Sequence, residues 1–138
     1  MSVTTQAPPT ARTPTTVHVE VGGRRIALSF DVVRGVHRGA RWVEVPGTPP
    51  WCLGLVQLHG GLRSLVDAGL LFFDEPARGG YQLELKGLPV EVALLVDQVV
   101  GVFPDAGEAD LALDLAGLSV DPAFQPGAAG ASPATLEG

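Results

Sequence analysis

Two ten-residue segments of the chain resemble each other, and any fold must account for both. Residues 27–36 and 93–102 align without gaps and are identical at six of ten positions, including an aspartate and a glycine at matching offsets. Each segment follows an alternating stretch that ends in a glycine turn, residues 18–23 and 82–87. Similarity of this kind indicates a duplicated unit. We therefore predict two copies of one small β unit, with chance similarity between two Val- and Leu-rich strands as the alternative.

The stretch between the copies, residues 51–71, predicts a β-hairpin. Apolar runs at 52–58 and 62–66 flank His59, Gly60 and Gly61. Apolar runs of this length bounded by turn residues are typical of buried strands, and glycines in a three-residue connection allow a hairpin with a bulge. Asp67 then ends the second strand and is followed by a single helical turn at 68–71.

The remaining pattern is that of an all-β protein. The predicted strands are 17–21, 24–30, 42–45, 81–85, 88–95, 100–103 and 111–113, with a bend or helical turn at 31–36 and a helical turn at 115–118. Short strands separated by 18 glycines and 12 prolines favour two small barrels side by side. His18, Gln82 and Glu84 are expected on the solvent faces of their strands. The Pro-, Ala-, Thr- and Gly-rich tails, 1–16 and 121–138, are predicted to be disordered, which leaves 17–120 as the folded part.

Composition narrows the class of protein. No apolar run reaches the roughly 18 residues that a membrane span needs, and the polar N-terminus contains no secretory signal. Cys52 is the single cysteine and lies in an apolar run. These features indicate a cytoplasmic protein with a buried thiol. The net charge of −6 argues against nucleic acid as the main partner.

The charge is unevenly distributed. Residues 1–73 carry a net charge of +3 and residues 74–138 a net charge of −9. A basic cluster, Arg34, His37, Arg38 and Arg41, lies within one connection. Such a cluster is either a solvated loop or an electrostatic contact for an acidic partner surface.

Sequence motifs for catalysis are absent. The three histidines and Cys52 show no metal-ligand spacing, and no nucleophile, phosphate-loop or dinucleotide motif occurs. Asp67 and Asp97 follow apolar strands, where aspartates usually bind nearby backbone N–H groups. Their use with His59 as a catalytic group is an alternative that nothing else in the sequence supports. We therefore expect neither an enzyme nor a metal or cofactor site.

A non-catalytic protein of this kind would act through its surface. Two barrels packed together would leave a groove lined by the central hairpin. Gly54 and Gly60 would allow close backbone approach there. Such a groove suits a partner helix with an apolar stripe.

The order of these motifs resembles the CheW family, the adaptors of bacterial chemosensory arrays. The hairpin reads GLVQLHGGLRSLVDA from Gly54 to Ala68, a later strand reads LLVDQV, and the similarity extends from Val17 to Leu118. The resemblance implies two intertwined five-stranded β-barrels without catalysis. It also implies an adaptor between the cytoplasmic tip of chemoreceptors, held in the groove between the barrels, and a CheA-type histidine kinase. The partner-binding positions that it implies are Val33, Val36, Gly54, Gln57, His59 and Gly60.

The chain also departs from the family pattern. The hairpin's usual Asn, Arg and Pro are Gln57, His59 and Ser64, the Leu after the Asp is Ala68, and a usual Glu is Gly35. The connection at 103–111 is too short for the further strand that family members have there. We therefore expect one incomplete barrel, with receptor binding retained and kinase coupling weakened or lost. The alternatives are an ordinary coupling protein that bridges receptor and kinase, and a small β-barrel module that binds an unrelated peptide or ligand.

Overall fold

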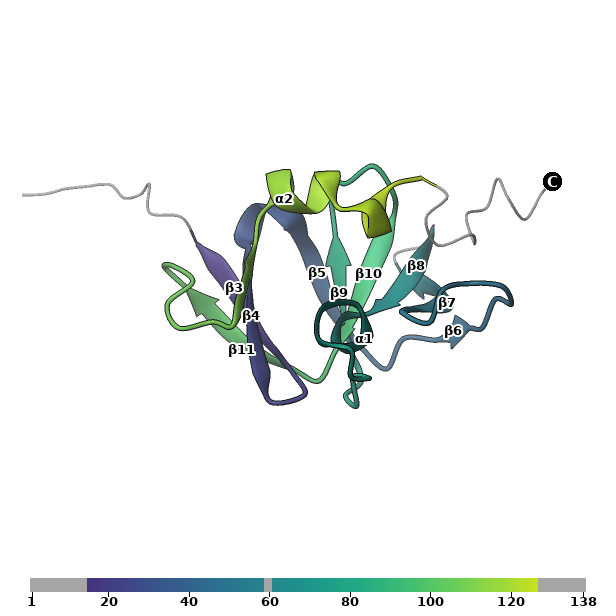
Figure 1. The fold of residues 1–138 in the computed structure, drawn as a ribbon, viewed down its shortest axis with the longest axis horizontal. Coiled ribbons are helices and arrows are strands. Elements are labelled where there is room, and N and C mark those ends of the chain that lie inside the picture. The colour runs from purple at the N-terminus through teal and green to yellow at the C-terminus, as the bar shows by residue number, and fades with distance from the viewer. Residues whose placement is uncertain (1–14, 59–60, 127–138) are drawn as a thin grey trace, which may run out of the picture.

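The computed structural model describes residues 15–58 and 61–126, which form two β-sheets and a few short helices (Figure 1). The large sheet has the strand order β5-β9-β10-β8-β7-β6 and the small sheet β11-β3-β4-β12. The large sheet contains β5 (Val33–Arg38), β6 (Trp42–Val43), β7 (Cys52–Leu58), β8 (Gly61–Asp67), β9 (Tyr81–Leu85) and β10 (Val92–Val96). The small sheet contains β3 (Thr16–Val21), β4 (Arg24–Ser29), β11 (Gln98–Phe103) and β12 (Leu111–Leu113). The helical segments are α1 (Ala68–Phe73), α2 (Leu115–Val120), η1 (Phe30–Val32) and η2 (Pro122–Phe124).

Both sheets contribute to the main hydrophobic core. Its fully buried members include Ile26 and Leu28 from the small sheet and Leu83 and Leu94 from the large sheet. Phe124 of η2 is also fully buried there. A smaller cluster lies on the other face of the large sheet, since successive side chains of a strand point to opposite faces. It consists of Val56, Leu58, Leu65, Ala93 and Leu95.

The duplication predicted from sequence is confirmed by a reciprocal exchange of strands. β3 and β4 pair in the small sheet, and β5 then crosses to pair with β9 in the large sheet. Conversely, β9 and β10 pair in the large sheet, and β11 crosses to pair with β3 in the small sheet. Both crossing strands have an irregularity at the matching place, between Val33 and Gly35 and between Val99 and Gly101.

The equivalence extends beyond the segments that are alike in sequence. β8 runs parallel to β10 with Leu65 opposite Ala93, and β12 runs parallel to β4 with Ala112 opposite Ala27. Asp67 and Asp114 therefore occupy equivalent positions, and each caps a six-residue helix, α1 and α2. Each unit thus ends in the same strand–aspartate–helix element.

The two units differ at one edge. In the large sheet β8 is followed by β7 and β6, whereas the described part of the small sheet ends at β12. Only residues 104–110 connect β11 to β12, which agrees with the shortened second half expected from sequence. The all-β class is confirmed, but the strands form two open sheets rather than closed five-stranded barrels. The edge strands β5 and β6 are consecutive in the chain, joined by residues 39–41.

Several local predictions were wrong. His18, Gln82 and Glu84 are 3%, 2% and 0% exposed rather than solvated. The predicted bend at 31–36 contains strand β5, because this stretch pairs with β9. The ordered part does not end at residue 120, since Phe124 packs into the core. Within the described residues, no helix has the length and apolarity to cross a membrane.

Candidate partner-binding surface

One candidate surface is the face of the hairpin β7–β8 that continues onto β6. Gln57 lies opposite Leu62, and Val43 lies opposite Leu55. Because side chains alternate along a strand, Val43, Gln57 and Leu62 share one face. Leu62 is 53% exposed and Val43 is 63% exposed. The backbone N–H of Gln57 donates to the carbonyl of Arg41, 3.3 Å away, which places Arg41 beside this face.

Val43 and Leu62 are not among the binding residues predicted from sequence. Val43 ends the two-residue strand β6 and Leu62 is the second residue of β8, and periodicity alone does not distinguish such apolar residues from core residues. We call Val43, Gln57 and Leu62 the hairpin face.

A second candidate surface is the edge strand β5. Val36 is 46% exposed, and the side chains of Arg34 and Arg38 are exposed as well. The Arg38 guanidinium lies over the Tyr81 ring, 5.4 Å from its centroid. Val33 is half-buried and packs against the main core, so its role in the structure is packing.

The structure does not group all the predicted binding residues. β9, β10 and β8 separate β5 from β7 in the large sheet, so Val36 and Gln57 are not strand neighbours. A Cβ on Gly54 would lie 1.9 Å from the Val43 carbonyl oxygen. Gly54 is therefore buried under β6 and allows the two backbones to approach closely, which removes it from the exposed surface. His59 and Gly60 lie outside the described residues.

A buried ionic cluster is centred on β9, which lies between β5 and the β7–β8 hairpin in strand order, and occupies the sheet face opposite Val36 and Leu62. The Glu84 carboxylate is completely buried, 2.6 Å from Arg63 Nη2 and 2.9 Å from His37 Nε2. Arg34 Nε lies 3.9 Å from the same carboxylate, and Arg63 also pairs with Glu91 at the surface. The three side chains around the carboxylate come from β5 and β8, whereas Glu84 lies on β9.

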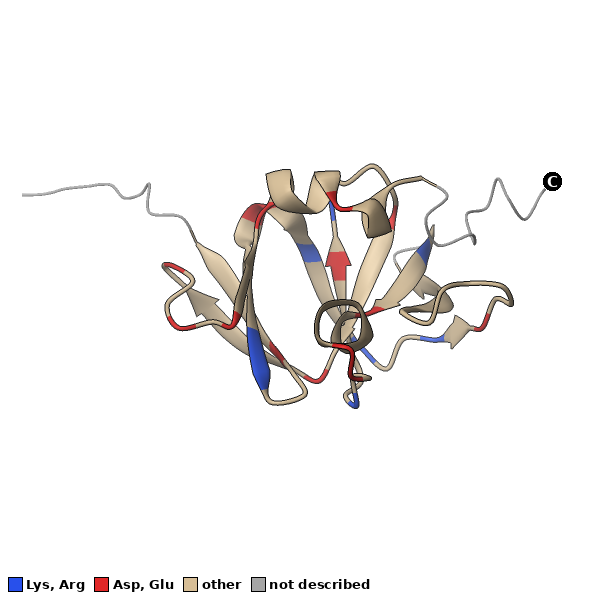
Figure 2. Cartoon of the chain, in the orientation of Figure 1, with Lys and Arg blue, Asp and Glu red and all other residues tan. Residues whose placement is uncertain are grey.

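The uneven charge seen in sequence has a spatial counterpart. Basic residues lie on β4, on β5 and in the chain leading to β6, while acidic residues occupy the connections around β11, β12 and α2 (Figure 2). Arg34, Arg38 and Arg41, the predicted electrostatic patch, thus lie on β5 and beside the hairpin face.

Asp67 and Asp97 bind backbone N–H groups, as predicted. Asp67 Oδ1 accepts from Leu70 N at 3.0 Å and from Ala77 N at 2.9 Å. Asp97 accepts from Gly22 N at 2.9 Å, Arg78 N at 2.6 Å and Gly79 N at 2.8 Å. Asp67 thereby joins the start of α1 to the loop that follows it, and Asp97 joins the turn after β3 to the chain before β9.

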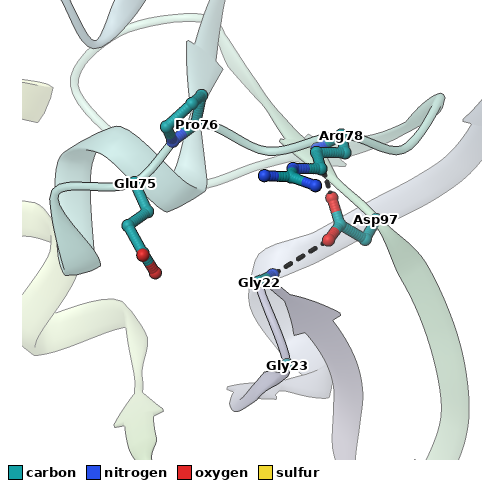
Figure 3. A pocket seen from close by; sticks show the side chains of 6 residues that line it. All are labelled: Gly22, Gly23, Glu75, Pro76, Arg78 and Asp97. Carbon is teal, nitrogen blue, oxygen red and sulfur yellow. Dashed lines mark hydrogen bonds between the residues drawn. The ribbon is translucent and has the colours of Figure 1, made fainter.

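Asp97 lines a shallow pocket of about 400 Å³, together with Gly22, Gly23, Glu75, Pro76 and Arg78 (Figure 3). Its carboxylate points at backbone N–H groups, and Glu75 pairs with Arg24 at 3.0 Å. Within residues 15–58 and 61–126, no group of three or more His, Cys, Asp or Glu side chains is arranged to hold a metal ion. Burial raises the pKa of the Cys52 thiol, which disfavours the reactive thiolate.

The architecture defines a class of protein: a duplicated, two-sheet β domain with reciprocally exchanged strands. The chain belongs to the CheW-like domain family, whose model matches residues 15–105, and this confirms the resemblance seen in sequence. Among solved structures, the chain is similar to the scaffolding protein TtCheW from Thermoanaerobacter tengcongensis, with a TM-score of 0.61 and 20% sequence identity. The similarity covers 67% of this chain and 65% of that one, and at this identity it shows a shared fold. A search of curated proteins found no match.

Proposed function

We propose that the chain is a non-catalytic cytoplasmic adaptor of a bacterial chemosensory array. It binds the helical cytoplasmic tip of a chemoreceptor, and its coupling to a CheA-type histidine kinase is weakened or lost. The observation that carries this proposal is the CheW-like domain over residues 15–105, with a complete first unit and a shortened second one.

The exposed apolar residues of the first unit support the receptor contact. Val36 on β5 and Val43 and Leu62 on the hairpin face are each at least 46% exposed. Apolar side chains on a folded surface suit the apolar stripe of an amphipathic helix. Arg34, Arg38 and Arg41 lie around these residues, so the helix would carry acidic residues beside its stripe.

The difference between the two units supports the loss of kinase coupling. The small sheet has no described counterpart of β6 and β7, so the second unit offers a smaller surface than the first. A partner that needs both complete units would lose contacts on this side. A partner that needs only the first unit would not.

Calorimetry of the full chain with a chemoreceptor signalling tip, and then with the regulatory domain of a CheA-type kinase, tests the proposal. We expect the receptor tip to bind and the kinase domain not to bind. Binding of both would identify an ordinary coupling protein. Binding of neither would favour a small β module with an unrelated peptide or ligand as its partner.

The duplication supplies a matched pair of variants. Val36 and Val102 occupy equivalent positions and are 46% and 57% exposed, on β5 and β11 respectively. Val36→Glu should weaken receptor binding about tenfold or more, because a charge then enters an apolar contact at a cost of about 1.4 kcal/mol or more. Val102→Glu should leave the affinity unchanged. Equal losses from both variants would contradict binding through the first unit.

A further inference from the structure

The most unusual group in the interior is the carboxylate of Glu84. It lies on β9 at the centre of the ionic cluster, and its side chain is completely buried. Its cross-strand neighbours are Gly35 on β5 and Ala93 on β10. These small residues leave room on both sides, so cationic groups can reach the carboxylate from both directions.

The cluster joins β5 and β8, two strands that do not pair with each other. β5 has β9 as its strand neighbour in the large sheet, and β8 is separated from β9 by β10. Arg63 reaches Glu84 from β8 at 2.6 Å, and His37 reaches it from β5 at 2.9 Å. One carboxylate therefore links the β7–β8 hairpin to the edge strand.

A second side chain of β9, that of Gln82, also helps to fix the position of the β5–β6 segment. The Gln82 side chain is buried and accepts a hydrogen bond from the backbone N–H of Ala40 at 3.1 Å. This bond holds the connection between β5 and β6 against β9. The polar face of β9 thus contacts both β5, through His37, and the connection from β5 to β6, through Ala40.

The equivalent position in the small sheet has different chemistry. His18 on β3 lies opposite Ala27 and Gly101, as Glu84 lies opposite Ala93 and Gly35. His18 Nε2 lies 2.9 Å from the carbonyl oxygen of Asp105, in the connection that replaces the two missing strands. The link between hairpin and edge strand is therefore a feature of the large sheet, where the proposed binding surface lies.

We propose that Glu84 is a positioning residue. Its buried carboxylate sets the position of β5 relative to the β7–β8 hairpin and so the geometry of the partner-binding surface, without touching the partner. The expected effect on receptor affinity rests on the proposed function. The effect of Glu84 on the position of β5 is measured without any partner.

The test uses two variants, because removing one member of a buried ion pair alone can prevent folding. Glu84→Gln removes the charge and keeps the shape. The double variant Glu84→Leu with Arg63→Met replaces the pair by apolar groups, a change that often preserves stability. His18→Leu is the matched control at the equivalent position of the small sheet.

The first readout is hydrogen exchange of the β5 backbone amides in the full chain, with global stability measured by urea unfolding. In the double variant we expect exchange in β5 to rise at least tenfold while the urea midpoint stays near that of the wild type. His18→Leu should raise exchange around residues 104–110 and leave β5 unchanged. Unchanged β5 exchange in the folded double variant would overturn the positioning role.

The second readout is affinity for the chemoreceptor tip. The double variant should bind about tenfold more weakly than the wild type, and His18→Leu should bind equally well. Wild-type affinity in a double variant with faster β5 exchange would overturn the link to the binding surface. If the wild type itself does not bind the tip, the proposed function fails, and β5 exchange still decides the positioning role.

Discussion

Single residues show how duplication was followed by divergence. Two positions that are equivalent in the fold, His18 and Glu84, are both buried and polar but have different partners. Glu84 pairs with Arg63 and His37, whereas the His18 ring packs against Phe103 with 4.3 Å between ring centroids. Burying a polar group is costly unless it is hydrogen-bonded or paired, so each unit evolved its own set of contacts.

The Asp97 carboxylate gives a pH-dependent prediction. Burial raises its pKa, but hydrogen bonds from the Gly22, Arg78 and Gly79 amides and the Arg78 charge lower it, and the net pKa is below the ordinary value. A lowered pKa contributes stability above the unfolded-state value of about 4, and this contribution is lost as the pH falls through the folded-state pKa.

We therefore expect Asp97→Asn to reduce the free energy of unfolding by about 1–2 kcal/mol at pH 7 and by less at pH 3. Urea unfolding at both pH values measures this difference. Asp31→Asn is the control, because Asp31 accepts only from the Ser29 hydroxyl in the described structure. A loss of equal size at pH 7 and pH 3 would contradict the ionic origin of the effect.

At the scale of elements, the repeated strand–aspartate–helix element is used in two ways. Asp67 is 2% exposed and binds Leu70 N at the start of α1 as well as Ala77 N in the following loop. Asp114 is exposed and binds Gly117 N at the start of α2. The capping aspartate of the first unit is thus buried and also binds the following loop, whereas that of the second unit is exposed and binds only its own helix among the described residues.

Asp67→Ala should therefore destabilise the fold by about 2 kcal/mol or more, since it leaves buried N–H groups without an acceptor. Asp114→Ala should cost about 1 kcal/mol or less, as for an exposed helix cap. Chemical denaturation of both variants measures the difference. Equal costs would show that burial of Asp67 adds nothing to its capping role.

At the scale of the whole molecule, the exchange of β5 and β11 makes the two units interdependent. β5 completes a sheet with β9 of the second unit, and β11 completes a sheet with β3 of the first. The main core contains residues from both sheets. Neither unit contains a complete sheet or a complete core.

A fragment of residues 1–80 should therefore lack native circular dichroism and show no cooperative unfolding, while the full chain unfolds in one transition. Mixing fragments 1–80 and 81–138 is expected to restore part of the native signal, because the exchanged strands then find their partners. Two separate transitions in the full chain would indicate that the units fold independently.

The all-β class, the duplication and most strands were predictable from the amino-acid sequence, since these depend on local alternation, turn residues and matching offsets. The role of Asp67 and Asp97 as acceptors for backbone N–H groups was also predictable, because aspartates that follow apolar strands commonly have it, but the fold decided that Asp97 binds the distant Gly22 and Arg78 amides. The burial of Glu84 was not predictable, because alternation assigned it to solvent, whereas the large sheet has side chains packed on both faces. Its pairing with Arg63 depends on strand order, which brings together residues from β8 and β9 across β10. Tertiary structure alone decided which polar residues are buried and which apolar residues, such as Val43 and Leu62, remain exposed, because burial depends on what packs against each face.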